Sequence, residues 1–149
     1  MFLEFADWLI YADVESNRTY AKQELSEHCL CAFCKNFYNT VDRHYPNVRY
    51  FLSKFGLEIE APDSLIPIPE RLYQVSYEAE GRVLRWGSEP IQVGELPITI
   101  EEDTENGLIL LNLGLMELPW SLDESPDSVK KPDGIPDLFA SFRKEKTQQ

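Results

Sequence analysis

The sequence lacks any apolar run long enough to cross a bilayer, which takes about 20 residues. Its first residues include Glu4 and Asp7 rather than a basic stretch, and no small-residue cleavage site follows them. We therefore expect no secretory signal peptide. These absences predict a cytoplasmic protein that does not associate with membranes.

Glycine is scarce, with seven residues in 149, so the backbone has few places at which it could cradle phosphate. The sequence contains no Gly-rich phosphate loop, no Gly-x-Ser-x-Gly pattern and no His-Glu-x-x-His pattern. Adjacent acids such as Glu101 and Glu102 are expected by chance in a chain with 26 acids. We assign no catalytic residue on these grounds, and the sequence favours a protein that is not an enzyme.

Positive charge is nearly missing from the middle of the chain. Residues 58–127 carry sixteen acids against three bases, whereas the flanking segments are close to neutral, and the whole chain has a net charge of −12. Such a field repels phosphate groups, so direct nucleic-acid binding is not expected. It predicts instead a protein partner with a basic surface, or an acidic decoy that imitates nucleic acid in a partner's basic groove.

The composition predicts one folded domain over residues 1–149. Hydrophobic residues make up 43% of the chain and aromatic residues 12%, which is too apolar for disorder. We expect an α+β fold in which two consecutive helices pack on an antiparallel sheet of about five or six strands, because a one-sided apolar helix and a half-buried sheet cover each other.

The N-terminal part, residues 1–56, combines a predicted strand with two helices. Residues 2–14 favour a strand, with an amphipathic helix as the alternative, and the polar residues 15–28 indicate a loop or a strand return. Apolar residues then recur every three or four positions from Phe37 to Phe55, which predicts helices over 32–44 and 46–55 with Pro46 at the start of the second. Gly56 is expected to end that helix.

The remaining residues predict a linker, a set of strands and a tail. Residues 57–70 contain three prolines and indicate an extended linker. Alternating residues in 71–118 predict antiparallel strands at 72–78, 82–86, 91–93, 98–100 and 108–113, with a turn at Glu80 and Gly81 and a hairpin turn at Asn106 and Gly107. Residues 118–120 are expected to be exposed, and residues 121–149 to form a loop and tail.

All three cysteines lie in one short segment that also contains a histidine: His28, Cys29, Cys31 and Cys34. The odd number of cysteines argues against a closed disulfide framework. Cys31 and Cys34 have the two-residue gap that lets two sulfurs bind one ion, and an extended backbone would turn Cys29 toward the same side. Because a helix start also stabilises thiolates, these four residues predict a structural zinc site, and no other cofactor is expected.

The fourth ligand is the open question of this predicted site. His28 adjoins Cys29 and would project to the opposite side of an extended segment, and His44 lies ten residues beyond Cys34, about 15 Å along a helix. An Asp, a water molecule or another chain are alternatives. Inert buried thiols and a reversible disulfide also fit the segment.

Three functions remain open at this point. The sequence favours a non-enzymatic protein-binding or accessory module with a structural zinc site. The first alternative is the acidic decoy for a partner that binds nucleic acid. The second is a cysteine-dependent enzyme with Cys31 or Cys34 as nucleophile, which requires a histidine within hydrogen-bond distance.

Overall fold

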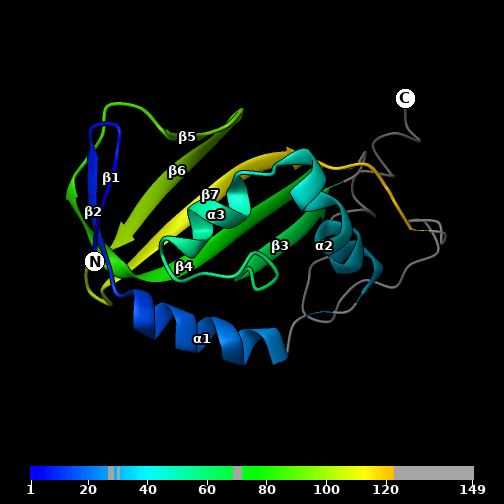
Figure 1. Cartoon of the computed structure of the whole chain (residues 1–149), viewed down its shortest axis with the longest axis horizontal. Coiled ribbons are helices and arrows are strands. Elements are labelled where there is room, and N and C mark those ends of the chain that lie inside the picture. The colour runs from blue at the N-terminus through cyan, green and yellow to red at the C-terminus, as the bar shows by residue number, and fades with distance from the viewer. Residues whose placement is uncertain (27–28, 30, 69–71, 123–149) are drawn as a thin grey trace, which may run out of the picture.

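The computed structural model describes residues 1–26, 29, 31–68 and 72–122 of the chain. Within these ranges three helices pack with an antiparallel sheet, so the predicted α+β class is confirmed (Figure 1). The sheet has seven strands, where the sequence predicts five or six. The helices are α1 (Val14–Ser26), α2 (Ala32–His44) and α3 (Val48–Ser53). The strands are β1 (Phe2–Phe5), β2 (Trp8–Ala12), β3 (Ser64–Ile68), β4 (Leu72–Arg85), β5 (Ile91–Val93), β6 (Leu96–Asp103) and β7 (Leu108–Glu117).

The long strand β4 is the centre of the sheet and has two partners along one of its edges. β3 pairs with its first half and β2 pairs with its second half, while β7 pairs along the opposite edge. β6 and β5 follow β7, and β1 follows β2, so the order is β1-β2-β4-β7-β6-β5 with β3 beside β4. Figure 1 shows α2 and α3 in front of this sheet and α1 along its lower edge.

Between β2 and β3, the backbone N–H and C=O groups on the edge of β4 form hydrogen bonds with side chains from outside the sheet. Asn17 of α1 accepts the Glu80 N–H through Oδ1 (2.7 Å), and its Nδ2 donates to the carbonyl oxygens of Phe55 (2.9 Å) and Glu80 (3.3 Å). Asp63 accepts the Glu78 N–H. Since a buried backbone group without a partner is costly, these side chains allow one strand to run past the gap between its two neighbours.

The predicted turn at Glu80 and Gly81 is wrong, because β4 continues through both residues to Arg85. A Cβ atom at Gly81 would lie 2.3 Å from the Tyr11 carbonyl oxygen of β2. The glycine therefore permits a close approach between two strands and does not mark a turn. The strands predicted at 72–78 and 82–86 are two halves of one strand.

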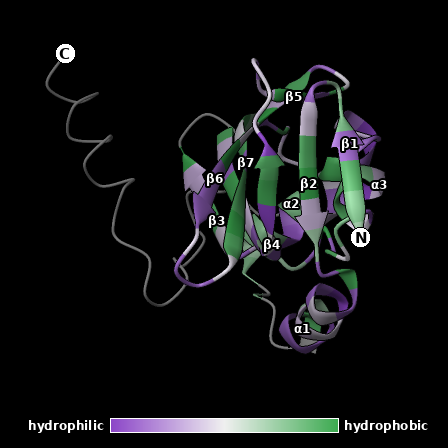
Figure 2. Ribbon diagram, turned by 90° about the vertical axis from the view of Figure 1, so that its left-hand side faces the viewer, coloured by the Kyte–Doolittle hydropathy of each residue, from purple (hydrophilic) through white to green (hydrophobic). Residues whose placement is uncertain are grey.

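Residues 2–14 form strands as predicted, but as a hairpin of β1 and β2. The turn residue Ala6 has a φ of +51°, in the left-handed region that non-glycine residues seldom occupy. The loop or strand return predicted for 15–28 is wrong over residues 15–26, because α1 runs from Val14 to Ser26, and residues 27–28 lie outside the described residues. Asn17 and Ala21 are its buried residues, so it carries almost no apolar stripe, and Figure 2 shows it mainly in purple and pale colours.

The helix predicted over 32–44 is confirmed as α2, and the helix predicted over 46–55 is present as the shorter α3. The predicted start at Pro46 is wrong, because α3 begins at Val48 with Asn47 as its N-cap, and Pro46 lies in the turn before it. The apolar stripe of the two helices lies in the core. Its most buried members, each exposed by 4% or less, are Phe37, Val41, Val48, Phe51, Leu52 and Phe55. Gly56 follows α3 with a φ of +85°, as the predicted helix end requires. Of the helices in the described ranges, none combines the length and the apolar character that crossing a membrane requires.

The predicted linker at 57–70 contains the edge strand β3, which includes Pro67. Proline suits an edge strand because the N–H groups on the open side of such a strand have no ladder partner, so the N–H that proline lacks is not needed there. The exposure predicted for residues 118–120 is wrong: Leu118 is fully buried, and the half-buried Trp120 packs edge-on against Phe33 with ring centroids 5.6 Å apart. From residue 123 onward the predicted loop and tail lie outside the described residues.

Candidate metal centre

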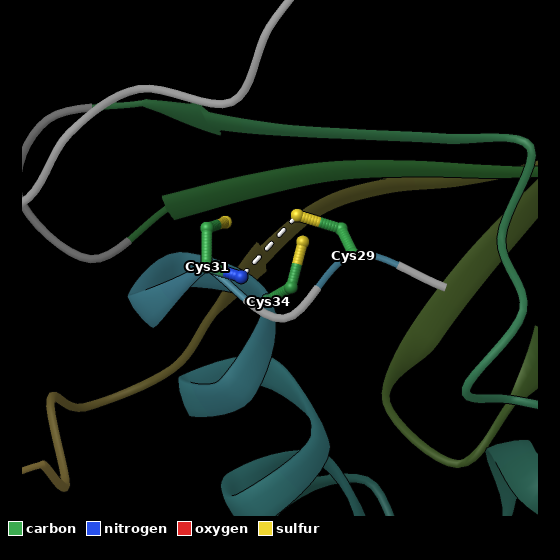
Figure 3. Close-up of side chains that lie close together, drawn as sticks. All are labelled: Cys29, Cys31 and Cys34. Carbon is green, nitrogen blue, oxygen red and sulfur yellow. Dashed lines mark hydrogen bonds between the residues drawn. The ribbon is translucent and has the colours of Figure 1, made fainter. Parts of the chain in front are cut away.

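Three cysteine sulfurs converge where the chain enters α2. The Sγ atoms of Cys29, Cys31 and Cys34 all lie within 4.8 Å of one another, and Figure 3 shows the three side chains gathered at the first turn of the helix. Cys31 immediately precedes α2 in an extended conformation (φ −66°, ψ 164°), and Cys34 lies in its first turn. The sulfurs of a tetrahedral zinc–thiolate site are about 3.8 Å apart, so this trio needs only a small contraction to bind one ion.

Backbone and side-chain hydrogen bonds fix the segment that carries Cys29. The N–H of Cys31 lies 3.4 Å from the Cys29 sulfur, the contact drawn as a dashed line in Figure 3. The hydroxyl of Tyr38 donates to the Cys29 carbonyl oxygen (3.1 Å) from the second turn of α2. Free N–H groups at a helix start and the helix dipole both stabilise negative charge, so this end of α2 favours thiolates.

Burial and mutual hydrogen bonding set the protonation of the trio. A hydrogen bond from the Cys34 thiol lowers the pKa of Cys31 to about 5. The same bond, together with burial, raises the pKa of Cys34 well above its usual range, and burial raises that of Cys29. Because the pKa values of Cys29 and Cys34 are raised, a metal ion has to displace the protons of these two thiols.

The buried Asn36 ties the cysteine segment to the sheet and to the chain after β7. Its Nδ2 donates to the Tyr73 hydroxyl (3.0 Å) and to the Pro119 carbonyl oxygen (3.1 Å). Its Oδ1 accepts from the N–H (2.7 Å) and the hydroxyl (2.9 Å) of Ser121. The Tyr73 hydroxyl in turn donates to the Phe33 carbonyl oxygen (3.3 Å). Sequence reasoning missed Asn36. The one sign of its role in the sequence is that it is a polar residue next to the apolar stripe of α2.

The two histidines differ in how far the structure describes them. His28 lies outside the described residues. His44 is exposed and ends α2, so the structure does not bring it to the cysteines at the start of the same helix. Within the described ranges, Cys29, Cys31 and Cys34 are thus the predicted ligands that the structure brings together.

The donor set decides what the site can hold. Thiolates are soft ligands that suit zinc, whereas magnesium and calcium require oxygen ligands. Three sulfurs provide three corners of a tetrahedron, and the fourth position falls to a ligand beyond the described residues or to water. The same two-residue gap between Cys31 and Cys34 is also compatible with dithiol–disulfide chemistry.

The chain matches no protein-family model, and the comparisons with curated proteins and with solved structures give no match. The assignment of this site therefore rests on its own geometry.

Proposed function

We propose that the protein is a non-enzymatic accessory module in which a structural zinc ion, bound by Cys29, Cys31 and Cys34, fastens the start of α2, and that it binds a protein partner with a basic surface. The convergence of three sulfurs within 4.8 Å is the observation that carries the zinc assignment. His28 is our candidate for the fourth ligand, and this choice requires the backbone to turn between His28 and Cys29.

The surroundings of the trio support a structural role for the ion. Cys34 is buried, and Cys29 and Cys31 are half-buried, so the trio is partly shielded from water. The ion would join the segment before α2 to its first turn, beside the hydrogen bonds of Asn36 and Tyr73 that connect this turn to the sheet. With a fourth protein ligand the set of ligands would be closed, and an ion at such a junction would add stability instead of presenting an open position to a substrate.

Negative surface charge supports the partner assignment. Residues 58–127 hold thirteen more acids than bases, and among the acids described there most of the side chains are exposed. A field of one sign raises the rate at which a partner of the opposite sign associates.

Cobalt titration tests the zinc assignment. Purified, reduced protein is expected to bind one equivalent of Co²⁺ with the absorption bands of thiolate coordination, and one equivalent of Zn²⁺ should bleach them. Cys29→Ser, Cys31→Ser and Cys34→Ser should each weaken binding, whereas the matched control His44→Ala should not. His28→Ala reports whether that residue is the fourth ligand. If the thiolate absorption bands are absent and all three thiols react with an alkylating agent, the cysteines do not bind a metal ion.

One observation favours the acidic decoy as a second candidate. Four exposed acids lie on the outer face of the sheet, which is the face turned away from α2 and α3. They form two rows, and residues of β7 lie between the rows. They are Glu78 and Glu80 on β4, and Glu101 and Asp103 on β6. Acids two residues apart on a strand are about 6.8 Å apart, which is comparable to the spacing of phosphates along an extended nucleic-acid strand.

A charge-neutralised variant tests the decoy. The wild-type protein should displace duplex DNA from protamine, and the variant with all four acids changed to amides should not. A matched variant neutralises four exposed acids that lie outside this face: Glu15, Asp42, Glu89 and Glu95. If the two variants displace DNA equally well, the net charge of the protein, and not the arrangement of acids on this face, is responsible for the displacement.

A further inference from the structure

A cleft of about 760 Å³ lies between the β1–β2 turn, α3 and β5. Figure 1 shows the β1–β2 hairpin on the left and α2 on the right, so the cleft lies away from the cysteine trio. Phe5, Tyr50 and Val93 provide apolar surface in it, and the buried Phe51 and Ile91 lie beneath. Its volume is in the range that binds a small molecule or several side chains of a peptide.

One wall of this cleft is the open edge of the sheet. β5 is the last strand in the order, and it pairs with β6 in a tight hairpin that Val93 and Leu96 close. Because hydrogen-bonded and non-hydrogen-bonded pairs alternate, the next residue, Gln92, directs its N–H and carbonyl groups away from β6. Its partner across the hairpin is Pro97, which has no N–H to offer. Gln92 thus presents an unused backbone donor and acceptor at the cleft.

The opposite wall is held in place before any ligand arrives. Asp7 in the β1–β2 turn accepts hydrogen bonds from the N–H (3.0 Å) and the hydroxyl (2.8 Å) of Ser88. The Trp8 indole N–H donates to the Glu89 carbonyl oxygen (2.7 Å). These bonds join the hairpin turn to the loop before β5, so binding would require little ordering of the cleft.

The charges at the cleft fit a cation. Asp7 and Glu89 are exposed at its rim, and Glu95 is exposed in the turn after β5. Lys54, the base that lines the cleft, has its ammonium group over the rings of Phe5 (5.4 Å) and Tyr50 (4.9 Å). Asp7 already accepts hydrogen bonds from Ser88, and Arg85 donates to its carbonyl oxygen (3.0 Å), so a partner's basic side chains would meet the remaining negative charge of Asp7 and the Glu89 carboxylate.

We propose that this cleft binds an extended segment of a partner protein in which basic and apolar side chains alternate, and that the segment adds to the sheet by pairing with Gln92 of β5. An extended peptide that joins an open sheet edge gains affinity from main-chain hydrogen bonds, and alternate side chains face opposite sides. Here apolar side chains face Phe5 and Val93, and basic ones meet Asp7 and Glu89. The inference rests on the proposed partner binding and specifies its site.

The probe is an acetylated and amidated five-residue peptide of alternating lysine and valine, titrated into ¹⁵N-labelled full-length protein. Amide signals of β5 and of the β1–β2 turn are expected to shift and saturate, with affinity that falls as salt increases. A peptide in which glutamate replaces lysine should bind at least about ten-fold more weakly. The lysine peptide with an N-methylated central valine should also lose binding, because it lacks a main-chain donor.

Two variants at one position separate the backbone contact from the side chain. Gln92→Pro removes the N–H that faces the cleft and leaves the β5–β6 hydrogen bonds intact, so it should fold and bind at least about ten-fold more weakly. Gln92→Ala keeps that N–H and should bind as the wild type does. Thermal unfolding of both variants checks the fold independently of binding.

Three results would overturn the proposal. They are no shift in β5 up to about 1 mM lysine peptide, undiminished binding by folded Gln92→Pro, and shifts confined to the acids of the outer face at Glu78 and Glu101. The last result would instead support the decoy. Metal content is measured on the same sample, so loss of the zinc assignment and loss of the peptide site are seen separately.

Discussion

The hydroxyl of Tyr38 donates a 3.1 Å hydrogen bond to the carbonyl oxygen of Cys29, and so connects the second turn of α2 to the segment before the helix. Tyr38 follows Cys34 by four positions, which places both on the same side of α2. Cys29, which lies before the helix, is thereby held near Cys34 in its first turn. This contact fixes the segment on which the third sulfur depends.

Tyr38→Phe removes that hydroxyl and keeps the ring. We expect affinity for Zn²⁺ to fall about ten-fold, because residues that orient metal ligands have effects of that size. Competition with a chromophoric chelator measures the change. The control Tyr50→Phe alters an exposed tyrosine of α3 and should leave the affinity unchanged. Equal affinity in all three proteins would show that Cys29 needs no support from Tyr38.

Asn36→Ala should lower the free energy of unfolding by about 2–4 kcal/mol. The change deletes hydrogen bonds to Tyr73, Pro119 and Ser121 and leaves buried groups without partners. Urea denaturation provides the measurement. Asn39→Ala, at an exposed position of the same helix, should stay within about 0.5 kcal/mol of the wild type. Similar values for the two variants would contradict the role given to Asn36.

Phe51→Ala tests the apolar stripe that connects the helices to the sheet. Phe51 is 4% exposed and packs against the rings of Phe5 (centroids 5.1 Å apart) and Phe55 (5.3 Å). Its removal should cost about 3–5 kcal/mol of unfolding free energy. The adjacent Tyr50 is 69% exposed, so Tyr50→Ala should cost about 1 kcal/mol or less. A small effect of Phe51→Ala would place this side chain outside the core.

Stability should also depend on Asp63. Burial raises the pKa of its carboxyl group to about 6, and the nearby Glu78 and Glu24 carboxylates add to this. The folded state therefore binds the proton more tightly than the unfolded state, and the Asp63 contribution to stability decreases as pH rises from about 4 to about 6. Asp63→Asn keeps an acceptor for the Glu78 N–H and should flatten the curve, with a gain of at most about 1 kcal/mol above pH 6 because water screens this site.

Asp103→Asn is the matched control for that pH series. Hydrogen bonds from Asn106 lower the pKa of the Asp103 carboxyl group, so its contribution has the opposite sign and is lost as pH falls below the ordinary range for Asp. Urea titrations of the three proteins from pH 4 to pH 7 compare them. A curve for Asp63→Asn that parallels the wild type would exclude a raised pKa at Asp63.

The sequence predicted those parts of the fold whose residues repeat with a clear period. The spacing from Phe37 to Phe55 gave both helices of the core, and the Asn106–Gly107 pair marked the β6–β7 hairpin, in which Gly107 has a φ of +65°. The convergence of the sulfurs followed from the spacing of the cysteines. In each case the local pattern is itself the cause of the structure.

The parts that were missed depend on contacts between distant segments. α1 has almost no apolar stripe, and Asn17 holds it against β4 and against Phe55, which follows α3. Gly81 resembles a turn residue until Tyr11 is placed next to it. Pro67 argued against a strand, yet β3 is at an edge where proline is tolerated. These three features follow from tertiary pairing, which no local period records.

Native mass spectrometry of the full-length protein, purified under reducing conditions without added metal, tests the zinc assignment most directly. We predict the mass of the chain plus one zinc ion, with three cysteines protected from iodoacetamide until a chelator is added. The triple variant Cys29→Ser, Cys31→Ser, Cys34→Ser should carry no metal. The mass of the bare wild-type chain, with all three cysteines alkylated at once, would contradict the account.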